Sequence, residues 1–124
     1  MEGVRRLVNV GVDLNEQDHD GNTPLTWAAS NSYIQIIKLL VDAGADLNIR
    51  NNKGQTPLII AAAYASIEAI VLLIDGGADW NIIDNDGKDF LDYFKGGNKT
   101  IVMNSYPDKY KEYLMKKDSE KYNL

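Results

Sequence analysis

The 124-residue sequence has no cysteine and only one histidine, His19. Disulfides, thiolate nucleophiles and zinc sites that need sulfur ligands are therefore excluded. A lone histidine cannot form a metal-binding pair, and it lacks partners at the spacing of a Ser-His-Asp or Cys-His set. We expect no metal, no cofactor and no catalytic site, and we interpret His19 as a solvated turn residue or a contact residue at a loop tip.

Long apolar runs are also missing. No stretch approaches the ~20 apolar residues of a membrane span, and residues 1–17 carry charges where a signal peptide would be apolar. The content of 44% hydrophobic and 25% charged residues is that of a globular domain. The net charge is -5, and acids outnumber bases over residues 18–103, which disfavours binding to nucleic acid. The sequence thus predicts a cytoplasmic protein that binds neither membranes nor nucleic acid.

A repeat of 33 residues runs through the sequence. Gly21, Gly54 and Gly87 lie 33 residues apart, and Thr23-Pro24-Leu25 recurs as Thr56-Pro57-Leu58. The same offset relates three further sets: Gly11, Gly44 and Gly77; Asp13, Asp46 and Asp79; Asn15, Asn48 and Asn81. Such periodicity indicates a solenoid, in which each unit buries its apolar face only against its neighbours.

Each repeat predicts two helices joined by a polar break. Thr23 and Thr56 are suited to N-capping, and the prolines that follow them fit the first helical position, where a missing N–H costs nothing. Small alanines then allow neighbouring helices to approach closely. Apolar stripes over residues 34–41 and 67–74 predict the second helices. The glycines that follow these stripes fit the left-handed conformation of a helix C-cap, and the Asn-, Asp- and Gly-rich links after them predict projecting turns.

The order of these features resembles the ankyrin repeat: a turn, Thr-Pro-Leu-x-x-Ala-Ala, a longer helix, and Gly-Ala-Asp-x-Asn. The resemblance implies an all-α helix-turn-helix solenoid with projecting β-turn or hairpin loops. It also implies a protein–protein interaction module, because family members act as scaffolds that bind other proteins through the turn tips and the concave helix face. In many relatives a histidine follows Thr-Pro-Leu. Thr26 and Ile59 stand there in this sequence, so we expect apolar packing around Ile59 to replace part of that histidine's hydrogen-bond network.

The resemblance divides a single domain into unequal units. We expect Met1 to be the natural start, with a cut from a longer array as the alternative. Phe94 and Lys95 replace the alanines of the third unit and would block a further one. Pro107 is expected to start an extra C-terminal helix that frays from about Asp118. The apolar face expected for that helix consists of Tyr106, Tyr110, Tyr113 and Leu114. The expected units are 1–17 as a partial repeat, 18–50 and 51–83 as repeats, 84–106 as a degenerate repeat, and 107–124 as a capping helix and tail.

Two segments invite comparison with ion or phosphate sites. Residues 84–89 begin like a calcium-binding loop, but placing Gly87 sixth puts Ile82 first and Tyr93 twelfth, so required oxygen ligands are missing. The pair at residues 96–97 follows no strand and is not a phosphate cradle. We interpret the acidic segment as an ordinary Asx-Gly turn that recurs with the repeat.

The predicted contact surface combines the turn tips with the inner wall of the short helices. Trp27 and Ile60 are expected to pack in the core, whereas Tyr64 fits an interface anchor. Because the body of the protein is acidic, we expect the partner to be another protein with a basic or polar face, and the binding to weaken with salt. The predicted partner-binding residues are His19, Asp20, Asn22, Ser30, Asn31, Asn52, Lys53, Gln55, Ala63, Tyr64, Asn85, Asp86 and Lys88.

Two other functions stay open at this point. A self-associating structural protein would form a homodimer through the incomplete N-terminal repeat, in place of the monomer that we expect. A small helical enzyme or metal-binding protein would need titratable groups that converge in a closed pocket, and a thin solenoid has little room for one.

Overall fold

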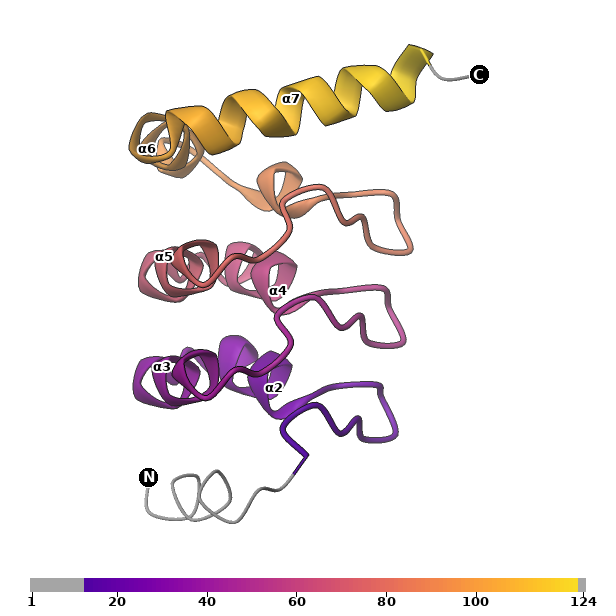
Figure 1. Ribbon diagram of the computed structural model, residues 1–124, viewed down its shortest axis with the longest axis vertical. Coiled ribbons are helices and arrows are strands. Elements are labelled where there is room, and N and C mark those ends of the chain that lie inside the picture. Colours follow the sequence, from indigo (N-terminus) through magenta and orange to yellow (C-terminus); the bar gives the residue numbers. More distant parts are fainter. Residues whose placement is uncertain (1–12, 123–124) are drawn as a thin grey trace.

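The computed structural model describes residues 13–122, which form six α-helices, one 3-10 helix and no strand. The expected partial repeat, and the dimer contact proposed for it, lie largely outside these residues. Helix pairs stack in tiers along the long axis of the molecule, and the turns project to one side (Figure 1). The paired helices are α2 (Pro24–Ser30) with α3 (Ile34–Asp42) and α4 (Pro57–Ala63) with α5 (Ile67–Asp75). The predicted all-α solenoid is confirmed.

The short helices α2 and α4 begin where the Thr-Pro pairs predict. The Thr23 hydroxyl accepts a hydrogen bond from the Thr26 amide at 3.2 Å, and the Thr56 hydroxyl accepts one from the Ile59 amide at 3.3 Å. Caps of this kind stabilise a helix by about 1 kcal/mol each. Thr26 also closes a capping box by accepting from the Thr23 amide. Ile59 is 1% exposed, so the expected apolar packing at this position is confirmed.

The longer helices end in the backbone geometry that their glycines predict. Gly44 has a φ of +87° and Gly77 a φ of +100°. Past α3, the Ala45 amide donates to the Leu40 carbonyl at 3.0 Å and the Gly44 amide to Val41 at 3.1 Å, and α5 ends in the same way. This pair of bonds is the Schellman motif, which uses a left-handed glycine to satisfy the last carbonyls of a helix.

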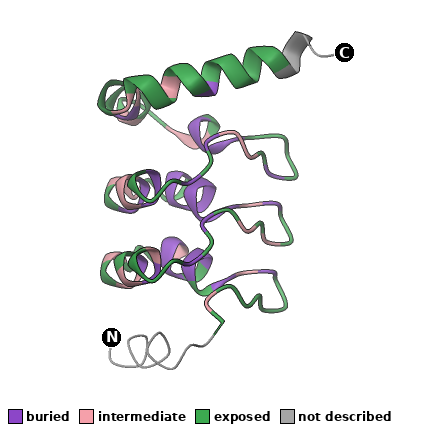
Figure 2. Cartoon of the chain, viewed as in Figure 1, coloured by how far each residue is buried: buried purple, intermediate pink, exposed green. Residues whose placement is uncertain are grey.

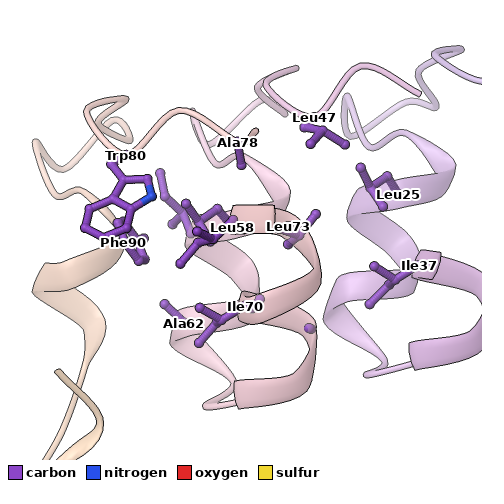
Figure 3. Packing of buried hydrophobic residues seen from close by; sticks show 14 of the residues in the cluster. Leu25, Ile37, Leu47, Leu58, Ala62, Ile70, Leu73, Ala78, Trp80 and Phe90 are labelled. Atoms are coloured by element: carbon purple, nitrogen blue, oxygen red, sulfur yellow. The ribbon is translucent and has the colours of Figure 1, made fainter. Parts of the chain in front are cut away.

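The core lies between the tiers. Figure 2 shows buried residues concentrated on α2 and α4 and on one side of α3 and α5. Alanines at the centres of the short helices are almost wholly inaccessible, which lets the helices lie close together. Around them pack Leu25, Ile37, Leu58, Ile70 and Leu73 (Figure 3). Each such side chain contributes roughly 1.5–3 kcal/mol through burial.

The C-terminal unit departs from the repeats. It consists of the 3-10 helix η1 (Phe90–Tyr93), α6 (Asn98–Ser105) and α7 (Pro107–Tyr122). Trp80, which is 5% exposed, packs its ring against Phe90, Tyr106 and Tyr113 with centroids 5.1, 6.3 and 6.1 Å away. Trp80 thereby fills the end of the core, beside Phe90 (Figure 3).

Helix α7 lies across the end of the stack (Figure 1) and exposes most of its residues. It begins at Pro107 as predicted and runs to Tyr122 in the described residues, while fraying from Asp118 stays a prediction. The expected apolar face is too wide: Tyr113 is buried, whereas Leu114 is 39% exposed. Tyr106, just before α7, and Tyr113 together cover Trp80, so the core does not need Leu114.

Polar contacts fasten α7 to the last turn. The Tyr113 hydroxyl donates to Asp89 Oδ2 at 2.6 Å, and Lys117 Nζ lies 3.4 Å from the same oxygen and 2.9 Å from the hydroxyl. Burial and the hydrogen bond to Asp89 together raise the pKa of Tyr113 to about 12. Asn81 donates to the Tyr113 carbonyl at 3.2 Å. In the regular units, the equivalent residues Asn15 and Asn48 instead accept from the amides of Asp46 and Asp79. Helix α7 therefore takes the place of the next repeat as the partner of this asparagine position.

Candidate protein-binding surface

Three projecting turns share one hydrogen-bonding pattern. The Asp18 carboxylate accepts from the amides of Asp20 and Asn22, both at 2.9 Å, and the Asn51 side chain accepts from the amides two and four residues further on. Asp84 does the same in the third turn. Burial would raise the pKa of Asp84, but hydrogen bonds from Tyr93 and from two backbone amides lower it overall.

These bonds confirm the Asx turns. The carboxylate oxygens that would ligate calcium serve the backbone instead. Within residues 13–122 no group of three metal-binding side chains comes together. The described helices include none that is long and apolar enough to cross a membrane.

The turns are joined to one another by asparagine. The Asn52 amide donates to the Asp20 carbonyl at 2.9 Å, and its side chain donates to the His19 carbonyl at 2.8 Å. Asn85 repeats both bonds one turn later, to Lys53 and Asn52. The turn tips are therefore held in a fixed register, which reduces the entropy lost when a partner binds to them.

A groove of about 470 Å³ lies where the first two turns meet the ends of the short helices. One wall is polar and comes from the turns, and the other comes from Ile60, Ala63 and Tyr64 on α4 and at its C-terminus. Ile60 is buried, while Tyr64 is 64% exposed and is among the most exposed large side chains of the described residues. The residues that line the groove are Asp20, Asn22, Ser30, Asn51, Asn52, Lys53, Gln55, Ile60, Ala63 and Tyr64.

Comparison with known families identifies the repeat. The family model of ankyrin repeats matches residues 1–84 in three copies, which is more than half of the chain. The chain belongs to the ankyrin-repeat family. Ankyrin repeats are generally protein–protein interaction modules, and the family is typically non-enzymatic. No curated protein matches this chain.

The ankyrin fold brings together most, but not all, of the predicted contact residues. The residues that line one groove are Asp20, Asn22, Ser30, Asn52, Lys53, Gln55, Ala63 and Tyr64. His19 is exposed on the first turn, and Asn85, Asp86 and Lys88 are exposed on the third, outside the groove. Asn31 is exposed at the end of α2, where its side chain donates to the Trp27 carbonyl at 2.8 Å.

Sequence reasoning missed two lining residues, Asn51 and Ile60, and misplaced Trp27, which lies outside the groove. Asn51 was available as the turn residue equivalent to Asp18, and Ile60 was assigned to the core, where it also lies. Core packing of Trp27 is wrong, since this side chain is 50% exposed. The buried residues of α2 flank it on both sides, so its indole turns outward and packs edge-on against Tyr33 at 5.0 Å.

The acidic character of the body does not extend to this lining. It contains one carboxylate, Asp20, and one ammonium group, Lys53. The acids that dominate the net charge lie elsewhere: Asp42 and Asp75 end the longer helices, and Asp89 caps η1. Side-chain amides make up most of the polar wall.

Proposed function

We propose that this chain is a protein-binding adaptor that holds a segment of a partner protein in the groove between its first two turns. The observation that carries the proposal is the meeting of rigid turn tips with an exposed aromatic side chain, Tyr64, over the buried Ile60. Exposed tyrosines beside a buried apolar floor are typical energetic centres of interfaces.

The remaining predicted contact residues would extend this interface. Asn31 follows Ser30, a lining residue at the end of α2, and His19, Asn85, Asp86 and Lys88 lie on the turn tips. We infer a partner with a polar face, since the lining is rich in amides and balanced in charge. A basic partner face is no longer favoured, because the lining supplies no excess of acid.

We also propose that the chain acts as a monomer, with residues 84–106 and 107–124 serving as its C-terminal cap. In support, α7 takes the place of a further repeat at Asn81 and Trp80. Light scattering at two concentrations should give a mass of one chain, 13.8 kDa, at both. A mass that rises with concentration would favour the self-associating alternative.

Affinity capture from the native cell extract tests the proposed surface. The double variant Tyr64→Ala, Lys53→Glu removes the aromatic anchor and reverses the one positive charge of the lining. We expect it to lose the proteins that the wild type retrieves.

A matched double variant serves as the control. Tyr33→Ala, Lys38→Glu makes the same two changes at exposed residues that do not line the groove. It should retrieve the wild-type set. If all three chains retrieve the same proteins, the proposed surface is wrong.

A further inference from the structure

The amide groups of the groove have a fixed orientation. Asn51 Oδ1 accepts from two backbone amides, those of Lys53 and Gln55, both at 3.0 Å. Its Nδ2 must therefore be the donor, and this atom contacts Asn22 at 3.0 Å and Gln55 at 3.1 Å. A donor requires acceptors, so both of these contacts are side-chain oxygens, Asn22 Oδ1 and Gln55 Oε1.

This orientation leaves two amide groups as unused donors. The Asn22 and Gln55 side chains have each committed their oxygen to Asn51, and the NH₂ group of neither has an acceptor among residues 13–122. Both side chains are half-buried and line the groove, as does Lys53. Beside the acceptor oxygens of Asp20 and Asn52, the polar wall thus presents two amide donors and an ammonium group, which can bind a hydrogen-bond acceptor.

The apolar part of the lining indicates which kind of side chain lies next to that acceptor. Ile60, Ala63 and Tyr64 offer an apolar floor and one exposed aromatic ring. Backbone carbonyls and carboxylates both accept hydrogen bonds from amides and from an ammonium group, but of the two only a carboxylate forms an ion pair with Lys53. The same ammonium group disfavours a basic side chain at this position.

We propose that the groove receives an aspartate or glutamate side chain of an extended partner segment, bound by Asn22, Gln55 and Lys53, with an adjacent apolar side chain on Ile60, Ala63 and Tyr64. This inference rests on the proposed function and specifies the chemistry of its partner. Asp20, on the first turn, is the one negatively charged lining residue, and it opposes such a ligand. Removing that charge should therefore tighten binding.

The test uses an array of N-acetylated, C-amidated hexapeptides, each pairing one variable position with an aromatic or aliphatic neighbour. Every peptide is present in Glu, Gln and Lys versions, and amidation removes the terminal carboxylate as a competing source of charge. The full chain should bind the best Glu peptides about tenfold more tightly than their Gln versions, as charge-assisted hydrogen bonds exceed neutral ones. It should bind the Lys versions least.

Three variants locate the effect. Gln55→Glu keeps the oxygen that Asn51 requires but replaces the free donor with an acceptor, so the preference for Glu peptides should vanish. Gln35→Glu makes the same chemical change at an exposed position outside the groove, and the preference should remain. Asp20→Asn should strengthen binding of Glu peptides a few-fold.

Equal binding of the Glu and Gln versions, or a preference for Lys, overturns the inference. The inference is also overturned if Tyr64→Ala abolishes the binding of no peptide in the array. None of these results decides the proposed function, which depends on the capture experiment. Capture that is sensitive to the groove but indifferent to peptide charge would uphold the adaptor role and refute the acidic segment.

Discussion

The two regular repeats and the C-terminal unit share the 33-residue periodicity, but their residues pack in opposite ways. In the repeats, α2 and α4 carry small alanines that admit a neighbouring tier. In the C-terminal unit the equivalent residues are Phe94 and Lys95, the short helix shrinks to η1, and Trp80 fills the end of the core. A repeat must leave room for the next tier, whereas a cap must fill that room.

The same contrast holds for the turns. A Cβ at Gly21 or Gly54 would meet an asparagine of the next turn, whereas one at Gly87 would meet no atom of the described residues within 4 Å. The polar groove lies at the first two, stacked turns. The third turn is held by a hydrogen bond from the Tyr93 hydroxyl to the Asp84 carboxylate. Stacking therefore shapes the groove that we propose as the binding surface, and the C-terminal unit covers the last tier.

The largest expected effect is at the two tryptophans. Trp80→Ala should lower the free energy of unfolding by about 4 kcal/mol, because it empties the end of the core. Trp27→Ala, at a half-exposed site, should cost about 1 kcal/mol or less. Urea unfolding followed by circular dichroism measures both. Equal losses would show that the C-terminal unit is not an integral part of the core.

Two glycines separate backbone strain from stacking. Gly54 and Gly87 have nearly the same φ, +77° and +76°, but a Cβ at Gly54 would lie 2.8 Å from the Asn85 amide nitrogen, whereas one at Gly87 meets nothing within 4 Å. Gly87→Ala should cost about 1 kcal/mol of unfolding free energy, and Gly54→Ala about 3 kcal/mol. The same unfolding assay applies. Identical costs would contradict the close contact between turns.

The hydrogen bond between Tyr113 of α7 and Asp89 should make the stability of the protein depend on alkaline pH. Removing the hydroxyl in Tyr113→Phe should cost about 2 kcal/mol at neutral pH, since the bond is to a carboxylate. The pKa of Tyr113 is raised to about 12, against about 10 in an unfolded chain. The folded state thus holds this proton more tightly, and its contribution to stability is complete below pH 10 and lost as pH rises towards 12.

Unfolding midpoints measured from pH 9 to 12 check this dependence. The decline of stability should be shallower in Tyr113→Phe than in the wild type. A residual decline is expected, because the pKa values of Tyr93 and Tyr106 are raised to about 12 as well. Parallel curves would mean that Tyr113 is not coupled to the fold in this way.

The smallest effect is a gain in stability. Ser32 and Ala65 have positive φ values of 54° and 56°, a conformation that disfavours side chains. Ala65→Gly should raise the free energy of unfolding by about 1 kcal/mol, because relief of this strain outweighs the added chain entropy. Ser66→Gly, at a neighbouring residue with φ -89°, should destabilise and serves as the control.

Much of the fold could be predicted from the sequence, because the repeat is specified by local chemistry. Thr23 and Thr56 cap their helices, Gly44 and Gly77 end theirs, and the turns hold themselves by Asx bonds, all within a few residues along the chain. The apolar face of α7 was harder to predict. It depends on how an aromatic cluster assembles from residues far apart, such as Trp80 and Tyr113.

The candidate site was predictable in outline only. The turn tips and the end of α4 were predicted from the resemblance to ankyrin repeats, and eight of the predicted residues do line one groove. The direction of Trp27 and the local balance of charge could not be read from composition, because both depend on which side of a short helix or turn faces the groove. The role of Asn51 in orienting its neighbours is a property of three-dimensional contacts.

Amide hydrogen exchange of the full chain, alone and saturated with its captured partner, tests the central claim most directly. We predict slower exchange in the complex at residues 20–22, 53–55 and 63–64, with little change in α7. Protection confined to α7, or to the outer helices α3 and α5, would contradict the division of labour between a binding groove in the repeats and a closing unit at the C-terminus.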